Sequence, residues 1–163
     1  MKRLFFLIFL FIVPSKISFS QEVKKPIDNK YLFNPYADAQ KALNDALMAA
    51  QKAHRHVLVV VGGDWSFWSR KMYGHLTRNH QYYNNYELVF INFSPVNKNE
   101  TILNQLHVPK DQGYPILIVL DENGNPLLTT DTDDLKLNPR AYDDDLLATF
   151  TEKWLTYKSN DKK

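Results

Sequence analysis

The sequence predicts an α/β fold with a mixed central sheet of about four to five strands and helices on both faces. The main observation is a set of continuous aliphatic runs, which are typical of strands buried on both faces. Two such runs occupy residues 56–62 and 115–120, and residues 86–93 are predicted to form a further buried strand with Leu88, Val89 and Ile91. Segments with helical spacing lie between them, and such alternation of strands and helices is typical of α/β proteins.

Four segments have apolar residues at intervals of three and four, the spacing of helices that pack on a sheet. They are about residues 36–54, 70–80 and 100–106, and the segment that begins at Asn138-Pro139. Asn34-Pro35 and Asn138-Pro139 both favour a helix start, because asparagine caps a helix and proline suits its first turn. On the last helix we expect one apolar face, made by Tyr142, Leu146, Phe150, Trp154 and Tyr157.

A turn and an acidic segment complete the predicted order of elements. Asn123-Gly124 follows the third aliphatic run, and this pair favours the positive φ angles of a hairpin turn. We therefore expect residues 126–130 to return antiparallel as an edge strand. An acidic loop over residues 131–138 should then connect this strand to the last helix.

The first 20 residues have the pattern of a secretory signal peptide, with cleavage expected between Ser20 and Gln21. A basic start precedes the apolar run Leu4–Val13, which is shorter than the about 20 residues that span a membrane. We therefore expect a periplasmic or secreted protein with no stable membrane anchor after cleavage. Further along, the sequence predicts a flexible lead-in, one folded domain and a disordered tail, over residues 21–33, 34–157 and 158–163.

The net charge of the chain argues against a nucleic-acid partner. Removal of residues 1–20 takes away three basic residues and no acidic one, so the formal charge changes from +2 to −1. A chain so close to neutral lacks the dense basic face that binds nucleic acid.

The spacing of the histidines favours surface or capping roles, so we expect no metal and no cofactor. They are His54, His56, His75, His80 and His107.

Two motifs lie at the ends of predicted strands. The first is Gly-Gly-Asp-Trp-Ser-Phe-Trp-Ser-Arg-Lys-Met over residues 62–72, and the second is Gly113-Tyr114-Pro115. Together they resemble the thioredoxin family over about residues 35–157. The chain is most similar to exported members whose loop reads Asp-Trp-Cys-x-Trp-Cys-x-x-Met. The matching residues are Asp64, Trp65, Trp68 and Met72, while Ser66 and Ser69 stand in place of both cysteines.

The resemblance implies a thioredoxin-like fold in which Pro115 follows a cis peptide bond and faces the first motif. It also implies a buried acidic residue six positions before the first cysteine, where this chain has Val60. Thiol–disulfide exchange needs a thiolate and a second thiol, and the chain has no cysteine. Ser66 and Ser69 therefore form a degenerate redox motif, and we expect no catalytic residue. Ser66 is interpreted as an inert replacement or a helix N-cap, since no catalytic base or nucleophile turn accompanies it.

We expect a redox-inactive module that binds a protein or an extended peptide without covalent capture. The expected groove consists of Asp64, Trp65, Ser66, Phe67, Trp68, Tyr114 and Pro115. Trp65 is the expected aromatic anchor, whereas Trp68 is expected to cover the core beneath the loop. Asp64 is either a ligand contact or a solvated acid. Two alternatives are an oxidoreductase whose cysteines were lost or mutated to serine, and a structural subunit of an envelope assembly.

Overall fold

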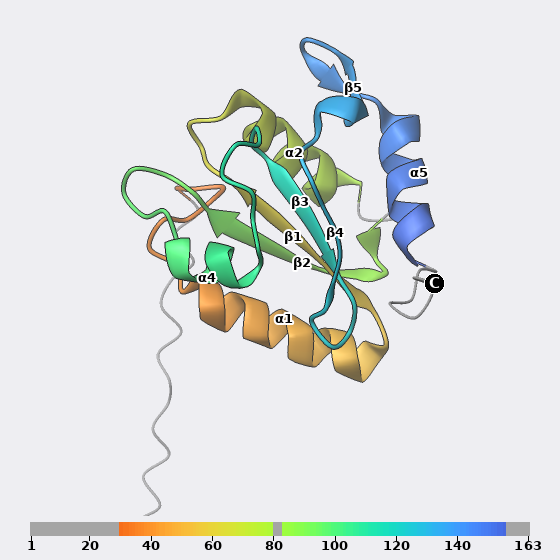
Figure 1. The fold of residues 1–163 in the computed structure, drawn as a ribbon. Coiled ribbons are helices and arrows are strands. Elements are labelled where there is room, and N and C mark those ends of the chain that lie inside the picture. The colour runs from red at the N-terminus through yellow and green to blue at the C-terminus, as the bar shows by residue number, and fades with distance from the viewer. Residues whose placement is uncertain (1–29, 80–82, 156–163) are drawn as a thin grey trace, which may run out of the picture.

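A four-stranded sheet forms the centre of the fold, with the strand order β2-β1-β3-β4 (Figure 1). The strands are β1 (His56–Gly62), β2 (Tyr86–Asn92), β3 (Ile116–Leu120) and β4 (Pro126–Thr130). β1 pairs parallel with β2 and antiparallel with β3, which pairs antiparallel with β4. The predicted α/β fold with a mixed sheet is therefore confirmed, with four strands in the main sheet.

The computed structural model describes residues 30–79 and 83–155. The predicted signal peptide, residues 21–29 of the predicted lead-in and the predicted tail lie outside the described residues. His80 and Tyr157, which we expected at the end of one helix and on the face of another, also lie outside them.

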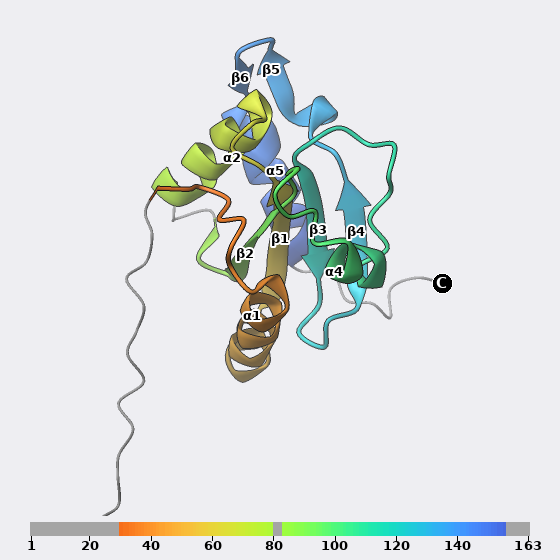
Figure 2. The same ribbon diagram turned by 90° about the vertical axis from the view of Figure 1, so that its left-hand side faces the viewer.

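Helices cover both faces of the sheet, as predicted (Figures 1 and 2). One layer contains α1 (Ala39–Ala53) and α4 (Glu100–Gln105), and the other contains α2 (Phe67–Arg78) and α5 (Asp144–Leu155). Side chains alternate along β1, because successive residues of a strand point to opposite faces. Val57, Val59 and Val61 pack in the first layer, while Leu58 and Val60 pack in the second.

Two helices begin elsewhere than predicted because different side chains cap them. α1 begins at Ala39, where the carboxylate of Asp38 accepts a hydrogen bond from the Lys41 N–H at 2.9 Å. The Asn34 side chain instead accepts from the N–H of Tyr36 within a turn. α2 begins three residues before the predicted Arg70, because Ser66 is its N-cap.

The prediction that Asn138-Pro139 opens the last helix is wrong. These residues lie at the turn of a hairpin between β5 (Lys136–Asn138) and β6 (Ala141–Tyr142), which follows a 3₁₀ turn at Asp133–Leu135. Pro139 suits this turn because its φ angle already has the value that a turn needs. α5 begins at Asp144, and the carboxylate of Asp143 accepts from the N–H groups of Asp145 and Leu146.

The buried face of α5 also differs from the predicted one. Leu147 and Thr151 are almost fully buried, whereas Leu146 is exposed. Tyr142 is buried as expected, but it belongs to β6 and not to the helix. Phe150 and Trp154 of the predicted face do pack against the core as half-buried side chains, so the prediction is wrong for Leu146 and incomplete without Leu147 and Thr151.

The contact between α2 and α5 contains a histidine whose titration should affect stability. The Nδ1 atom of His75 lies 3.1 Å from a carboxylate oxygen of Asp144, and the His75 side chain is buried. Burial lowers the pKa of His75 despite the opposing effect of Asp144. Burial also lowers the pKa of His56 at the start of β1.

We expect the protein to lose stability between pH 7.5 and 5.5. A folded-state pKa below the unfolded value of about 6.5 means that the unfolded chain binds more protons in this range. The stability that comes from keeping these histidines neutral is present above pH 6.5 and is lost as the pH falls through their folded-state pKa. Urea unfolding at both pH values measures the free energy of unfolding. Between pH 7.5 and 5.5 this free energy should fall less for His75→Gln than for the wild type. The exposed control His107→Gln should keep the wild-type loss, and equal losses in all three proteins would contradict the prediction.

Candidate functional site

Ser66 lies at the junction of β1 and α2, where it caps the helix. Its Oγ accepts a hydrogen bond from the backbone N–H of Ser69 at 3.2 Å. The Ser66 hydroxyl donates to the carbonyl oxygen of Tyr114 at 3.3 Å, and its side chain is buried. Ser66 therefore has the N-cap role, which was one of its two expected roles. Both of its hydrogen-bonding functions are engaged, so the structure provides no activated nucleophile at this position.

Ser69 lies beneath the loop, and its side chain is shielded from solvent. It is fully buried, and its Oγ has no hydrogen-bond partner within the part of the chain that the structure describes. Gly62 lies directly beside it, and a Cβ atom added to Gly62 would lie 2.5 Å from this Oγ. The last residue of β1 must therefore be glycine if the side chain at position 69 is to fit.

Asp64 holds the chain that precedes α1 against the loop. Its two carboxylate oxygens accept hydrogen bonds from the N–H groups of Phe33 and Leu32, at 2.9 and 3.1 Å. This anchoring role is neither of the two that the sequence suggested. The end of the predicted flexible lead-in is therefore corrected at Leu32 and Phe33, because Asp64 holds both and Phe33 is 1% exposed and packs in the same core layer as α2.

Trp65 is the most exposed aromatic residue of the loop, and its position is fixed. Its side chain is 56% exposed, yet its indole N–H donates to the carbonyl oxygen of Phe93 at 2.7 Å. Its ring also meets the ring of Tyr114 edge to face, with centroids 5.8 Å apart. Gly63 permits this position, because a Cβ atom there would lie 2.5 Å from the indole nitrogen.

Phe67 and Trp68 follow Trp65 and are placed differently. Phe67 is 42% exposed and contacts Trp68 edge to face. Trp68 is half-buried, packs against Tyr142 with centroids 5.0 Å apart, and carries the ammonium of Lys136 over its ring. Phe67 therefore belongs to the outer surface, whereas Trp68 joins the loop to the β5–β6 hairpin.

The second motif lies against the first. The Tyr114–Pro115 peptide bond is cis, and the carbonyl of Tyr114 accepts the hydrogen bond from Ser66. Pro115 is buried and Tyr114 is half-buried. Of the expected groove residues, Trp65 and Tyr114 are in ring contact, while Ser66 and Pro115 are buried and the Ser66 hydroxyl donates to the carbonyl of Tyr114. Phe67 is exposed at the first position of α2, directly after Ser66. We call Trp65, Phe67 and Tyr114 the loop surface.

The structure resembles solved structures of disulfide oxidoreductases. A disulphide isomerase from Xylella fastidiosa Temecula1 matches with a TM-score of 0.64 and 24% identity, covering 74% of this chain and 94% of that chain. The fold is thioredoxin-like. The resemblance found in the sequence is therefore confirmed at the level of the fold, with serine at both cysteine positions of the loop.

Two other solved structures match with lower TM-scores. A DsbH oxidoreductase has a TM-score of 0.47 and 18% identity, covering 74% of this chain and 81% of that chain. Trxlp from Edwardsiella tarda EIB202 has a TM-score of 0.43 and 21% identity, covering 72% of this chain and 95% of that chain. No protein-family model and no curated protein matches the sequence.

Phe93 is a site residue that the sequence did not indicate. The sequence placed it at the end of a buried strand, whereas β2 ends at Asn92. Its carbonyl oxygen holds Trp65, and its ring stacks on Tyr114 with centroids 4.6 Å apart and an interplanar angle of 12°. No local pattern could have indicated this role, because the residues that it joins are far apart in the sequence.

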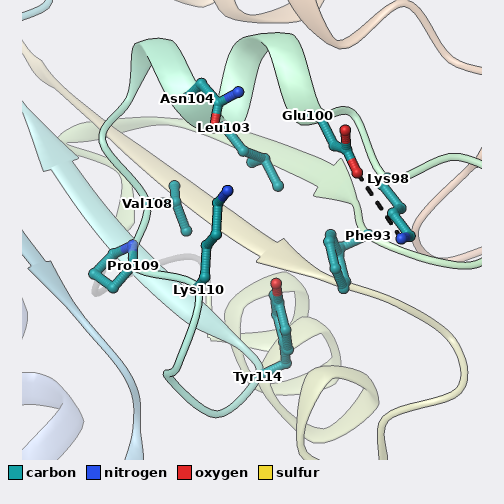
Figure 3. Close-up of a pocket in the computed structure, with 9 residues that line it drawn as sticks. All are labelled: Phe93, Lys98, Glu100, Leu103, Asn104, Val108, Pro109, Lys110 and Tyr114. Carbon is teal, nitrogen blue, oxygen red and sulfur yellow. Dashed lines mark ion pairs between the residues drawn. The ribbon is translucent and has the colours of Figure 1, made fainter.

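A pocket of about 250 Å³ adjoins the thioredoxin-like loop at Tyr114 (Figure 3). Its lining comes from the loop between β2 and α4, from α4 and from the segment before β3, and consists of Phe93, Lys98, Glu100, Leu103, Asn104, Val108, Pro109, Lys110 and Tyr114. Among these, only Tyr114 was an expected site residue.

Neither a metal site nor a membrane-spanning helix is found in residues 30–79 and 83–155. Histidine, aspartate and glutamate side chains do not gather there in a group of three that could hold a metal ion. No helix in the same residues is both long and apolar enough to cross a membrane.

Proposed function

We propose that this chain is a redox-inactive, thioredoxin-like binding module that holds extended or partly unfolded polypeptide on the loop surface. The predicted signal peptide supports a location in the periplasm or outside the cell. The observation that carries the proposal is the state of Trp65, which is 56% exposed while its indole N–H is hydrogen-bonded to Phe93.

A fixed and exposed aromatic ring is well suited to binding. Large aromatic side chains bury much apolar area, and they often supply most of the binding energy of an interface. Trp65 makes contacts on two sides, with the carbonyl of Phe93 and the ring of Tyr114, so little side-chain freedom is left to lose when a partner binds. Phe67, two residues after Trp65, is a second exposed aromatic side chain of the loop.

Binding at this surface is non-covalent. The chain has no cysteine, so it cannot form the mixed disulfide of thiol–disulfide exchange. Ser66 offers no substitute, because its hydroxyl is buried and engaged with Tyr114. A captured polypeptide would therefore be held and released by contacts alone.

The substitution Trp65→Ala should weaken binding of an unfolded polypeptide by about tenfold or more, the effect expected for an interface anchor. The probe is fluorescein-labelled lactalbumin that has been reduced and carboxymethylated so that it stays unfolded, and binding is read by fluorescence anisotropy. The matched control is Met48→Ala, which removes another exposed apolar side chain from the middle of α1. The control should bind the probe as the wild type does.

Two outcomes would contradict this proposal. Absence of binding by the wild type at concentrations up to about 1 mM would leave less than about 4 kcal/mol of affinity and would exclude a useful binding module. Equal binding by the wild type and Trp65→Ala would place the interaction on another face. The latter result would favour a structural subunit whose thioredoxin-like body packs in an assembly.

A further inference from the structure

The pocket beside Tyr114 has an apolar wall and a polar rim. Phe93, Leu103 and Val108 line it with apolar side chains. Its volume of about 250 Å³ is smaller than the roughly 300–1,000 Å³ of pockets for small organic ligands. A pocket of this size suits a single amino-acid residue better than a cofactor.

Hydrogen-bond donors without partners point into the pocket. Figure 3 shows the Lys110 ammonium and the Tyr114 hydroxyl directed into the space below Leu103. Within the described part of the chain, neither group has a hydrogen bond or ion pair. The other two charged residues of the lining are paired with one another, since the ammonium of Lys98 lies 3.9 Å from the carboxylate of Glu100.

The unpaired groups favour an anion. Lys110 carries a positive charge, and burial raises the pKa of the Tyr114 hydroxyl, so this group stays protonated and can donate. Lys98 and Glu100 offset one another, which leaves one net positive charge among the lining residues. A carboxylate can accept from an ammonium and a phenol together, and such charge-assisted bonds are the stronger kind.

We propose that this pocket receives the C-terminal residue of the bound polypeptide, with an apolar side chain against Phe93, Leu103 and Val108 and the terminal carboxylate between Lys110 and Tyr114. The inference rests on the proposed function and names the part of the polypeptide that the site selects. A C-terminal apolar residue uses both halves of the pocket. An internal acidic side chain would supply the charge but would leave much of the apolar wall uncovered.

The pocket and the loop surface are close enough for one extended chain to reach both. Tyr114 belongs to both, since its ring contacts Trp65 at 5.8 Å and stacks on Phe93 at 4.6 Å. An extended polypeptide advances about 3.3 Å per residue, so about two residues cover the distance between the Trp65 and Tyr114 rings. A chain that lies on Trp65 can therefore place its last residue in the pocket.

The test uses fluorescein-labelled decapeptides that end in leucine and have random sequence without acidic residues, made as the free acid and as the C-terminal amide. A third mixture carries the amide and one internal glutamate. The wild type should bind the free acid about tenfold more tightly than either amide, the effect of one hydrogen-bonded charge pair. Lys110→Ala and Tyr114→Phe should each reduce this preference, whereas Lys52→Ala, which removes an exposed lysine from the end of α1, should leave it unchanged.

The outcomes separate this inference from the proposed function. If Trp65→Ala weakens binding of all mixtures but the acid and amide bind equally, the loop surface binds polypeptide and the C-terminal pocket is wrong. If the internal glutamate restores binding to the level of the acid, the pocket takes acidic side chains and the assignment to the C-terminus is overturned. If no mixture binds, both proposals fail. Circular dichroism of each variant checks that Lys110→Ala and Tyr114→Phe remain folded.

Discussion

Replacement of Phe33 by alanine is expected to lower the free energy of unfolding by about 3–5 kcal/mol, the usual cost of removing a buried aromatic ring. Phe33 is 1% exposed. Its ring meets the ring of Phe90 edge to face, with centroids 5.7 Å apart, and also contacts Tyr73. The substitution leaves a cavity between the sheet and α2 that these rigid neighbours can fill only in part.

The large effect depends on the hydrogen bonds that hold Phe33 in place. Asp64 binds the N–H groups of Leu32 and Phe33, so the segment before α1 is tied to the loop. Urea unfolding monitored by circular dichroism measures the loss. Tyr36→Ala is the matched control, because it removes a ring that is 72% exposed and should change stability by less than about 1 kcal/mol. Equal effects of both substitutions would show that residues 30–33 are not part of the folded core.

The double substitution Ser66→Cys, Ser69→Cys is expected to form an internal disulfide when oxidised and to have a reactive thiol at position 66 when reduced. The Ser69 N–H already donates to the side chain at position 66, and the amino end of α2 favours a negative charge there. Thiols in this setting have pKa values below the ordinary value of about 8.5. The absence of a side chain at Gly62 leaves room beside position 69.

Thiol titration before and after mild oxidation tests this expectation. The double variant should lose both thiols and two hydrogen atoms of mass, while each single variant should keep its thiol. The rate of alkylation by iodoacetamide as a function of pH gives the thiol pKa of Ser66→Cys, which should be about one unit or more below 8.5. Persistence of both thiols after oxidation would show that the loop no longer has the geometry of a redox site. If the disulfide forms, reduction of insulin by the double variant would show that the remaining surroundings are competent.

The candidate site could be predicted from the sequence only in part. Trp65 and Tyr114 were expected site residues and their rings are in contact, because the ends of adjacent strands bring the two motifs to one edge of the sheet. The pocket was not expected. Lys98 and Lys110 lie in loops that no periodicity describes, and only the packing of α4 beside β3 places them on one cavity.

The sequence by itself determined the strands, the position of the loop and the loss of thiol chemistry. Continuous aliphatic runs such as those of β1 and β3 are typical of central strands buried on both faces, and a chain without cysteine cannot exchange disulfides. The tertiary structure decided which distant residues form hydrogen bonds. Phe33 bonds to Asp64, 31 positions away, and Trp65 bonds to Phe93, 28 positions away. It also decided that Asn138-Pro139 forms a turn and not a helix start. These features depend on which distant backbone groups meet when the sheet and helices pack, and local sequence patterns do not contain that information.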